Sequence, residues 1–269
     1  MSQFCCPVCK RALTAQDNTW RCDSGHSFDK ARSGYVNLLR SQQSALKRHG
    51  DDKRMLLARR AFLDRGFYEP LQRALCETVA ARTPANGVLL DAGCGEGYYT
   101  AAVAQTPPTL TVCGIDISKD ALQMASSRSK AIELAVASAF SLPVADGSVD
   151  TVISVFAPTA EAEFARVLKA DGTLIRVVPT ERHLYGLKAA IYKEPRLNKP
   201  ERTELDGFRL VHRQELTYEL TLQTTEDIRA LFEMTPYYYK TGQDDQARVL
   251  ARHSLCTEIG FAVLTYEKL

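Results

Sequence analysis

The sequence predicts an α/β protein built on a mostly parallel sheet and preceded by a small metal-binding module. From residue 88 onward, apolar segments with strand character alternate with segments of helical periodicity, the order that builds a parallel sheet. Ahead of them, four of the eight cysteines lie within the first 22 residues. With 269 residues, 45% of them apolar, the chain is long enough for one large α/β domain and an appendage.

The first 26 residues contain a candidate zinc site. Cys6 and Cys9 form a C-x-x-C pair, and Cys22 and His26 follow after twelve intervening residues. Two such pairs joined by a short hairpin bring three thiolates and one imidazole to the corners of a tetrahedron, the geometry that Zn²⁺ prefers. Four protein ligands leave no position for water, so we expect a structural site. Cys5 is an alternative to Cys6, and a redox pair is disfavoured because no βαβ context surrounds it.

Charge is distributed unevenly along the chain. The net charge is +2, yet residues 1–65 carry 13 Lys/Arg against 6 Asp/Glu. A basic first quarter is typical of a module that faces a polyanion, and an ordinary solvated face is the alternative. No stretch approaches the ~20 apolar residues of a membrane span, and the start lacks a signal-type apolar segment. Because the cysteine usage is that of a reducing compartment, we expect a cytoplasmic protein without membrane association.

The periodicity also predicts the order of the elements. A polar linker is expected over 41–54, and helices are expected over 55–63, 71–81, 98–104, 160–169 and 226–234. The strands of the parallel sheet are expected over 88–91, 110–116, 132–136, 151–156 and 173–178. Ser118 is the expected N-cap of a helix after the second strand. Strands over 215–222 and 262–266 are expected to close the sheet as an antiparallel pair.

The turn after the first strand of this sheet is the most informative segment for function. The strand ends at Asp91, and glycine then occupies every second position, at Gly93, Gly95 and Gly97. Such a turn carries few side chains, so a ligand can lie directly against the backbone. A lone glycine-rich turn also occurs where nothing binds. Here the second strand ends in Asp116, about 20 residues later, where an acid is expected to accept the hydroxyls of a ribose.

The charges around this turn indicate which cofactor binds. Dinucleotide sites use a G-x-G-x-x-G spacing and bind a pyrophosphate, whereas here the spacing is G-x-G-x-G and two acids, Asp91 and Glu96, flank it. Two carboxylates repel a pyrophosphate and attract a cation such as S-adenosylmethionine, which carries a sulfonium and an ammonium group. The segment resembles motif I of the class I methyltransferases. That resemblance implies a Rossmann-like sheet with Asp116 as the ribose-binding acid.

The loop after the fourth strand is expected to face the substrate. Methyltransferases that act on exocyclic base amines carry an Asn/Asp-Pro-Pro-aromatic sequence there, whereas this chain has Val155-Phe156-Ala157-Pro158. Adenine N6 chemistry is therefore disfavoured. Phe156 either stacks on a base or belongs to the core, and both interpretations stay open.

Six segments together resemble the RlmA-type guanine-N1 methyltransferases of large-subunit rRNA. They are C-P-x-C, C-x-x-x-H-x-F-D, residues 34–39, residues 58–64, D-x-G-C-G-E-G-Y-Y-T and Met-Thr-Pro at 234–236. The resemblance implies S-adenosylmethionine-dependent methylation of N1 of a guanosine in a hairpin of bacterial 23S rRNA. It also implies a homodimer whose zinc modules help to bind the RNA. By the same resemblance the zinc ligands are Cys6, Cys9, Cys22 and His26, and Gly95, Glu96, Tyr68 and His183 contact S-adenosylmethionine.

The chemistry that the resemblance implies needs the removal of a proton. Guanine N1 is protonated at neutral pH, so a base or a donor to O6 is expected to assist. Asp146, Asp150 and Glu161 lie near the fourth strand and are the candidates. The sequence singles out none of them as catalytic.

These observations predict three segments and leave two other functions open. Residues 1–40 are expected to be a zinc-binding RNA-recognition module, 41–84 a linker with helices, and 85–269 the S-adenosylmethionine-binding methyltransferase domain. A small-molecule methyltransferase of the quinone-biosynthesis type shares the L-P-x-x-D-x-S-x-D pattern of residues 142–150 but needs no zinc module. A non-catalytic RNA-binding protein that retains the cofactor is expected to have a degraded glycine turn.

Overall fold

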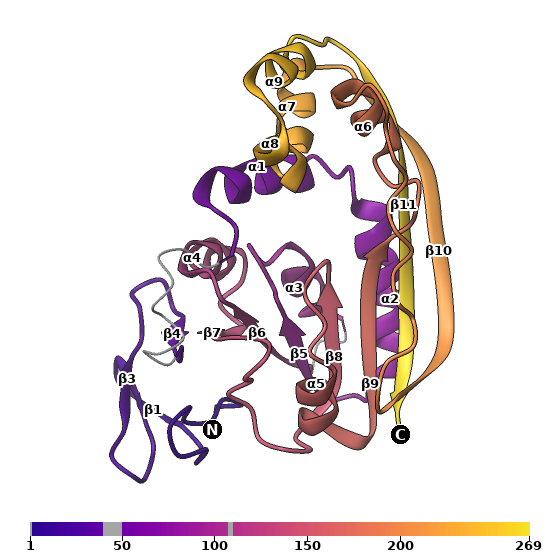
Figure 1. The fold of residues 1–269 in the computed structure, drawn as a ribbon. Helices are drawn as coiled ribbons and strands as arrows, with labels where there is room; N and C mark the ends of the chain where they lie inside the picture. Colours follow the sequence, from indigo (N-terminus) through magenta and orange to yellow (C-terminus); the bar gives the residue numbers. More distant parts are fainter. Residues whose placement is uncertain (1, 40–49, 107–109) are drawn as a thin grey trace.

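The central feature of the fold is an eight-stranded sheet with the strand order β10-β11-β9-β8-β5-β6-β7-β4 (Figure 1). The computed structural model describes residues 2–39, 50–106 and 110–269. Strands β9, β8, β5, β6 and β7 run parallel, and β10 and β11 close one edge as an antiparallel pair. A separate three-stranded sheet, β1-β2-β3, belongs to the N-terminal segment. The predicted fold class, a mostly parallel sheet closed by an antiparallel pair, is confirmed.

The expected strands and helices of the sheet are present. Most ends are shifted by a few residues, whereas β9 begins five residues before its expected start and β10 and β11 each begin seven residues before theirs. The strands are β1 (Thr14–Gln16), β2 (Thr19–Arg21), β3 (Ser27–Asp29), β4 (Val36–Asn37), β5 (Val88–Ala92), β6 (Thr111–Asp116), β7 (Glu133–Val136), β8 (Val149–Val155), β9 (Leu168–Pro179), β10 (Phe208–Leu222) and β11 (Leu255–Lys268). The helices are α1 (Lys53–Asp64), α2 (Glu69–Arg82), α3 (Tyr98–Val103), α4 (Lys119–Arg128), α5 (Glu161–Val167), α6 (Tyr185–Ile191), α7 (Thr225–Glu233), α8 (Pro236–Lys240) and α9 (Gln243–Leu250). Of the expected linker, residues 41–49 lie outside the described residues, and Lys53 and Arg54 belong to α1.

Alternate residues of the central strands enter two separate cores. Leu89 of β5 and Ile153 of β8 contribute to one core, which also contains side chains of α1, α2 and α4. Leu90 and Val152 contribute to the other core, which contains side chains of α5. Because successive strand residues point to opposite faces, a nearly continuous apolar run is what a sheet covered on both sides requires.

The N-terminal module covers part of the second face. Residues 137–148, which connect β7 to β8, contain no helix. Phe4, Leu13 and Trp20 of the module lie in the same core as Leu142 and Val144 of that connection. At the edge of the sheet, β4 pairs in parallel with β7. The module therefore takes the place that a crossover helix has in most parallel sheets.

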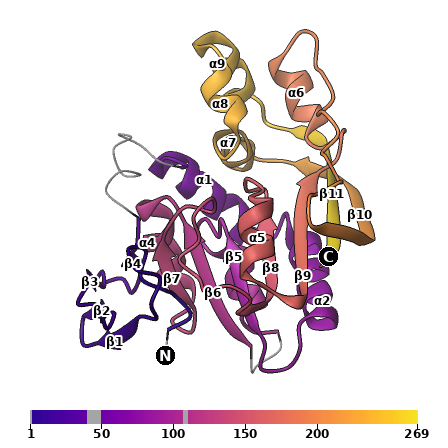
Figure 2. The same ribbon diagram turned by 60° about the horizontal axis from the view of Figure 1, so that its bottom comes forward.

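The two longest strands carry a helical cap. β10 and β11 reach beyond the parallel strands, and α6, α7, α8 and α9 lie at that end of the molecule, where α7 packs against α1 (Figures 1 and 2). Contacts between α1 and α7 join this cap to the carboxyl ends of the parallel strands. Among the described residues, no helix is long and apolar enough to cross a membrane.

Candidate active site and metal centre

The four predicted metal ligands of the N-terminal module lie together. The ligand atoms of Cys6, Cys9, Cys22 and His26 are all within 4.8 Å of one another. Cys9 Sγ lies 3.6 Å from Cys22 Sγ, and His26 Nδ1 lies 3.4 Å from Cys22 Sγ and 3.6 Å from Cys6 Sγ. A tetrahedron around Zn²⁺ with bonds of about 2.0–2.3 Å has edges of roughly 3.3–3.8 Å, so these separations fit the ion.

The surroundings of the cluster also suit a zinc ion. The backbone N–H of Arg11 lowers the pKa of Cys9 to about 6, with the Ser24 hydroxyl as a second cause, and this favours the thiolate that a metal needs. Cys5 is buried but does not belong to the four-residue cluster, so Cys6 is the better placed of the two alternatives. Trp20 is also buried, in the shared core, and is therefore a packing residue rather than an exposed stacking platform.

The glycine turn lies between β5 and α3, and its three glycines have different tasks. All three have positive φ angles. A Cβ on Gly93 would lie 2.5 Å from Cβ of Ala157, and one on Gly97 would lie 2.9 Å from Cβ of Ala125. A Cβ on Gly95 would meet only a guanidinium nitrogen of Arg59, at 3.9 Å. Gly93 and Gly97 thus permit close packing of the turn, whereas Gly95 faces open space over the backbone.

Asp91, the penultimate residue of β5, has a buried carboxylate of which only one oxygen has a hydrogen-bond partner among the described residues. Its Oδ2 accepts a hydrogen bond of 2.6 Å from the Thr100 hydroxyl, and its Oδ1 has no partner among the described residues. Burial raises the pKa of Asp91 to about 7. An unpartnered carboxylate oxygen in a dry site costs free energy unless a cation or donor reaches it, so this atom fits the ammonium group of S-adenosylmethionine.

The structure brings Asp116 to the glycine turn, as the spacing predicts. Asp116 Oδ2 accepts a hydrogen bond of 2.9 Å from Gly95 N, and Oδ1 accepts one of 2.8 Å from Ser118 N. Ser118 also caps α4, as expected, because its side chain accepts from Ala121 N. The two backbone bonds fix the carboxylate at the carboxyl end of β6, and its remaining lone pairs suit a ribose diol.

Glu96 has partners that the sequence analysis does not foresee. Its Oε2 accepts from Arg60 Nε at 2.9 Å and from Arg128 Nε at 2.7 Å, and its side chain is 1% exposed. Two guanidinium groups therefore neutralise this carboxylate. With its charge balanced in this way, Glu96 does not attract a cationic ligand as the sequence suggests. Its Oε1 has no partner among the described residues.

Tyr68 and His183, which only the resemblance singles out, lie side by side at the carboxyl ends of the strands. Their ring centroids are 6.1 Å apart, and both rings pack on Phe261 of β11. The hydroxyl of Tyr68 is buried and has no partner among the described residues. Burial lowers the pKa of His183 to about 3, so the imidazole is neutral, and its Nδ1 accepts from Gly260 N at 3.3 Å. The other ring nitrogen therefore carries the proton.

Phe156 extends this aromatic group towards solvent. It follows β8 in a left-handed conformation with a φ of 54°, which is rare for a residue with a large side chain. Its side chain is 46% exposed, and its ring centroid lies 5.5 Å from that of Phe261. A strained and exposed aromatic residue at the carboxyl end of a parallel strand indicates a functional position.

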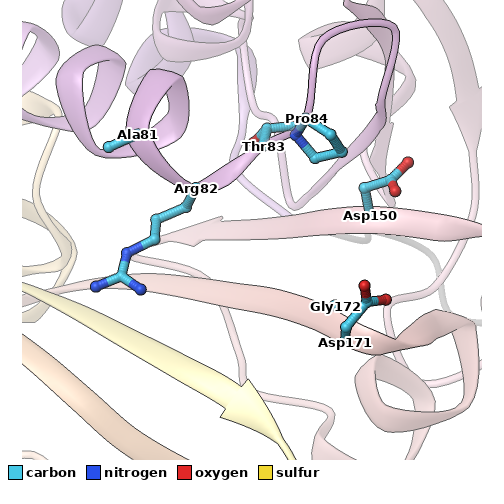
Figure 3. Close-up of a pocket in the computed structure, with 7 residues that line it drawn as sticks. All are labelled: Ala81, Arg82, Thr83, Pro84, Asp150, Asp171 and Gly172. Carbon is cyan, nitrogen blue, oxygen red and sulfur yellow. The ribbon is translucent and has the colours of Figure 1, made fainter.

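The carboxylates considered as bases are not placed for that role. Asp146 and Asp150 lie at the amino end of β8, opposite the glycine turn, and pair with Arg166 and Lys169. Figure 3 shows Asp150 in a pocket of about 330 Å³ at that far end. Glu161 pairs with Arg202 and accepts from Asp206 N. The structure therefore does not support Asp146 or Asp150 as the base, because sequence proximity to a strand does not say at which end the side chain lies.

Protonation of Asp91 is expected to make the stability of the protein depend on pH. The pKa of Asp91 is about 7 in the folded protein, and that of an unfolded aspartate is about 4. Proton binding by Asp91 therefore contributes its full share to the free energy of unfolding below pH 4, and this share is lost as the pH rises to 7. We expect the free energy of unfolding to fall by about 3 kcal/mol more in the wild type than in Asp91→Asn between pH 5 and pH 8. Urea titrations of both proteins at each pH measure the difference, and parallel pH profiles would contradict the prediction.

Comparison with known proteins gives the same assignment for each part of the chain. The family described as "RlmA, N-terminal" matches residues 4–47, and the family described as "Methyltransferase domain" matches residues 90–176. A solved structure from Anaeromyxobacter dehalogenans, whose title assigns it provisionally to the type II methyltransferases, covers 73% of this chain and 95% of its own. Its TM-score is 0.52 at 20% identity, which supports the fold alone.

Two curated relatives match over much of the chain. One is the 23S rRNA (guanine(748)-N(1))-methyltransferase of Streptomyces fradiae, 33% identical over 272 residues, with 96% of this chain and 95% of the relative covered. A protein of Micromonospora griseorubida, named provisionally as a 23S rRNA (guanine-N(1)-)-methyltransferase, is 40% identical over 202 residues, 68% of this chain and 67% of its own. The UbiE C-methyltransferase of ubiquinone and menaquinone biosynthesis from Geotalea uraniireducens matches only 33% of the chain and 44% of its own, at 30% identity.

The sheet order, the glycine turn and the acid that binds to it define an S-adenosylmethionine-dependent methyltransferase of class I, here joined to a zinc ribbon. Within that class, the similarity along nearly the whole length settles the narrower assignment. The chain belongs to the family of 23S rRNA (guanine-N1)-methyltransferases.

Proposed function

We propose that the protein transfers a methyl group from S-adenosylmethionine to N1 of a guanosine in a hairpin of bacterial 23S rRNA. The observation that carries the proposal is the presence, in one fold, of a zinc ribbon and an intact methyltransferase turn. A relative that bears this activity in its name aligns along 96% of the chain. Neither a zinc ribbon nor a basic N-terminal quarter is needed for a small-molecule substrate.

The zinc module is proposed to bind the RNA. Its cationic side chains are exposed, namely Lys10, Arg11, Arg21, Lys30 and Arg32. Exposed cations on one small module suit phosphate contacts, which supply most of the affinity for a nucleic acid. Accordingly, we assign residues 1–40 to RNA recognition, 41–84 to a linker and helices, and 85–269 to the methyltransferase domain.

The residues around the turn are proposed to hold S-adenosylmethionine, which supplies an electrophilic methyl group and a neutral leaving thioether. The backbone of Gly93, Gly95 and Gly97 lies under it, Asp91 receives its ammonium group, and Asp116 binds its ribose hydroxyls. Tyr68 and His183 close the site beside Phe261 and exclude water. Glu96 acts by fixing the turn through Arg60 and Arg128.

S-adenosylmethionine would supply the methyl carbon to N1 and leave as the neutral thioether, and the N1 proton would pass to a water molecule beside the base. This chain's contribution would be to position the base against the methyl group and to exclude bulk water. The carboxylates near β8 named in the sequence analysis are all occupied by cations, so none of them is assigned as the base.

The same proposal suggests how many copies of the chain act together and where in the cell they act. A single zinc module offers a small surface, and a homodimer would bring two of them to one hairpin. An enzyme whose substrate is ribosomal RNA works where ribosomes are assembled, so we propose the cytoplasm.

Methyl transfer to purified RNA tests the proposed function. Deproteinised 23S rRNA from a strain that lacks this gene is incubated with labelled S-adenosylmethionine, and the modified nucleoside is identified by mass. We expect label as 1-methylguanosine at one site. Matched rRNA from the parent strain, already methylated, should accept little label. Cofactor binding without label in any rRNA would favour a small-molecule substrate, and metabolite extracts would then be tested.

Phe156 is predicted to support the target base. We expect Phe156→Leu to lower kcat/KM for RNA by about 5- to 100-fold, since stacking of a base on an aromatic ring contributes about 1–3 kcal/mol. Phe156→Tyr should retain activity, and the affinity for S-adenosylhomocysteine should be unchanged in both variants. Phe156→Gly relieves the left-handed strain and should keep its melting temperature while losing activity. Equal activity of the Leu and Tyr variants would contradict a stacking role.

A further inference from the structure

Arg59 of α1 lies at the glycine turn, and no role in cofactor binding has been assigned to it above. Its guanidinium is 3.9 Å from the place that a Cβ on Gly95 would take, which is the open part of the glycine turn. Its Nη2 lies 3.5 Å from the carbonyl oxygen of Met234, at the end of α7. The side chain therefore bridges three segments on which the family resemblance rests, 58–64, 91–100 and 234–236.

Electrostatic effects locate the same cation next to the expected cofactor ligands. Burial raises the pKa of Asp116, Asp51 raises it further, and Arg59 opposes both. Burial likewise raises the pKa of Tyr68 and of Tyr99, and Arg59 opposes the rise in each. The positive charge of Arg59 thus lowers the pKa of Tyr68, Tyr99 and Asp116, which come from the start of α2, from α3 and from β6.

The partner of Arg59 distinguishes it from the other cations at this turn. Arg60 and Arg128 are committed to Glu96, whose side chain is 1% exposed. Arg59 instead pairs with Asp51, whose side chain is 33% exposed and which belongs to the segment that leads into α1. A partly exposed ion pair is worth little and is readily exchanged for another carboxylate.

S-adenosylmethionine brings one carboxylate into a site that is otherwise acidic. The ammonium and sulfonium groups have Asp91 nearby, but the α-carboxylate of the amino acid part needs a cation. A guanidinium offers two parallel N–H groups that match a carboxylate. We propose that Arg59 binds the α-carboxylate of S-adenosylmethionine, and that this carboxylate competes with Asp51 for the guanidinium. This inference rests on the proposed function.

The role of Asp51 follows from where its segment packs. The Ser118 hydroxyl lies 3.5 Å from the carbonyl oxygen of Asp51, and a Cβ on Gly50 would lie 3.1 Å from Cβ of Ser118. The segment therefore rests against the N-terminus of α4, beside Asp116. When the cofactor carboxylate takes Arg59, Asp51 loses its partner, and the segment that leads into α1 loses its ion pair with that helix.

Two ligands that differ only in the carboxylate test this inference by calorimetry. S-adenosylhomocysteine has the carboxylate, and S-adenosyl-3-thiopropylamine keeps the amine but lacks it. We expect the wild type to prefer the first ligand by about 10- to 100-fold, as for a charge-assisted pair in a partly buried site. Arg59→Met should abolish the preference by weakening only S-adenosylhomocysteine, and Arg59→Lys should keep part of it. The control Arg73→Met removes an exposed arginine of α2 and should change neither affinity.

The Asp51→Asn variant tests the exchange of carboxylates. We expect its affinity for S-adenosylhomocysteine to rise a few-fold while that for the amine stays unchanged, because a competing carboxylate is gone. A preference that survives in Arg59→Met would overturn the assignment, as would an equal loss of both ligands, which indicates a structural role. A wild type that binds neither ligand would instead overturn the proposed function itself.

Discussion

Replacing Cys9 with serine is expected to abolish methyl transfer to RNA and to lower the melting temperature by about 10 °C or more. The thiolate is one of four ligands in a closed site, and metal binding contributes directly to the folding of such modules. Each kcal/mol lost shifts the melting temperature of a chain this size by about 2–4 °C. Zinc content by atomic absorption, thermal unfolding and the RNA assay provide the three measurements.

A matched variant separates the ligand from cysteines in general. Cys256 is exposed and lies outside the metal cluster, so Cys256→Ser should keep zinc, stability and activity. Below its lowered melting temperature, Cys9→Ser should bind S-adenosylhomocysteine within about threefold of the wild type, since the turn residues are held by α1, α4 and β6. Loss of cofactor binding in parallel with RNA methylation would show that the two parts are not separable, and full zinc content in Cys9→Ser would remove Cys9 from the ligand set.

Replacing Asp116 with alanine is expected to weaken the binding of the cofactor while leaving the zinc module intact. Hydrogen bonds to a charged group contribute about 1.5–3 kcal/mol each, so loss of the ribose contacts should weaken S-adenosylhomocysteine by about 10- to 1000-fold. Isothermal titration measures the affinity, and zinc content should be unchanged. Asp116→Asn keeps one acceptor and should bind with intermediate affinity.

A control variant shows whether the position of the acid matters or only its negative charge. Asp120 lies four residues later in the first turn of α4 and is exposed, so Asp120→Ala should leave the affinity unchanged. If Asp116→Ala binds within twofold of the wild type, then the carboxylate serves only to anchor Gly95 and Ser118.

The parallel part of the fold was predictable because its signals are local. Short apolar strands, glycines with positive φ and the cap at Ser118 each depend on neighbouring residues, and all of them are where the sequence indicates. The lengths of β10 and β11 were not predictable in the same way. Their extended backbone is stabilised by pairing along 14 positions with each other and by the pairing of β11 with β9, which are interactions between segments far apart in the sequence.

The site was predictable only where spacing carries the information. The distance from Gly95 to Asp116 follows from a strand-turn-helix-strand unit of standard length, and the zinc ligands follow from two short pairs. In contrast, Glu96 meets Arg60 and Arg128, which are 36 and 32 residues away along the chain. Arg59 likewise reaches the turn from a helix whose position depends on the cap, so no periodicity in α1 distinguishes it from its neighbours.

The pairing of β4 with β7 has a consequence for how the chain matures. Val36 lies opposite Ala135, so the edge of the sheet is sealed only after about 100 further residues have been synthesised. Until then β4 has no partner strand. If the zinc module fails to fold because zinc is scarce, β7 presents an open row of backbone N–H and C=O groups, the kind of surface on which chains associate edge to edge. Metal supply during translation should therefore affect the soluble yield of this protein, and zinc-starved cells should contain a larger aggregated fraction of it than zinc-replete cells.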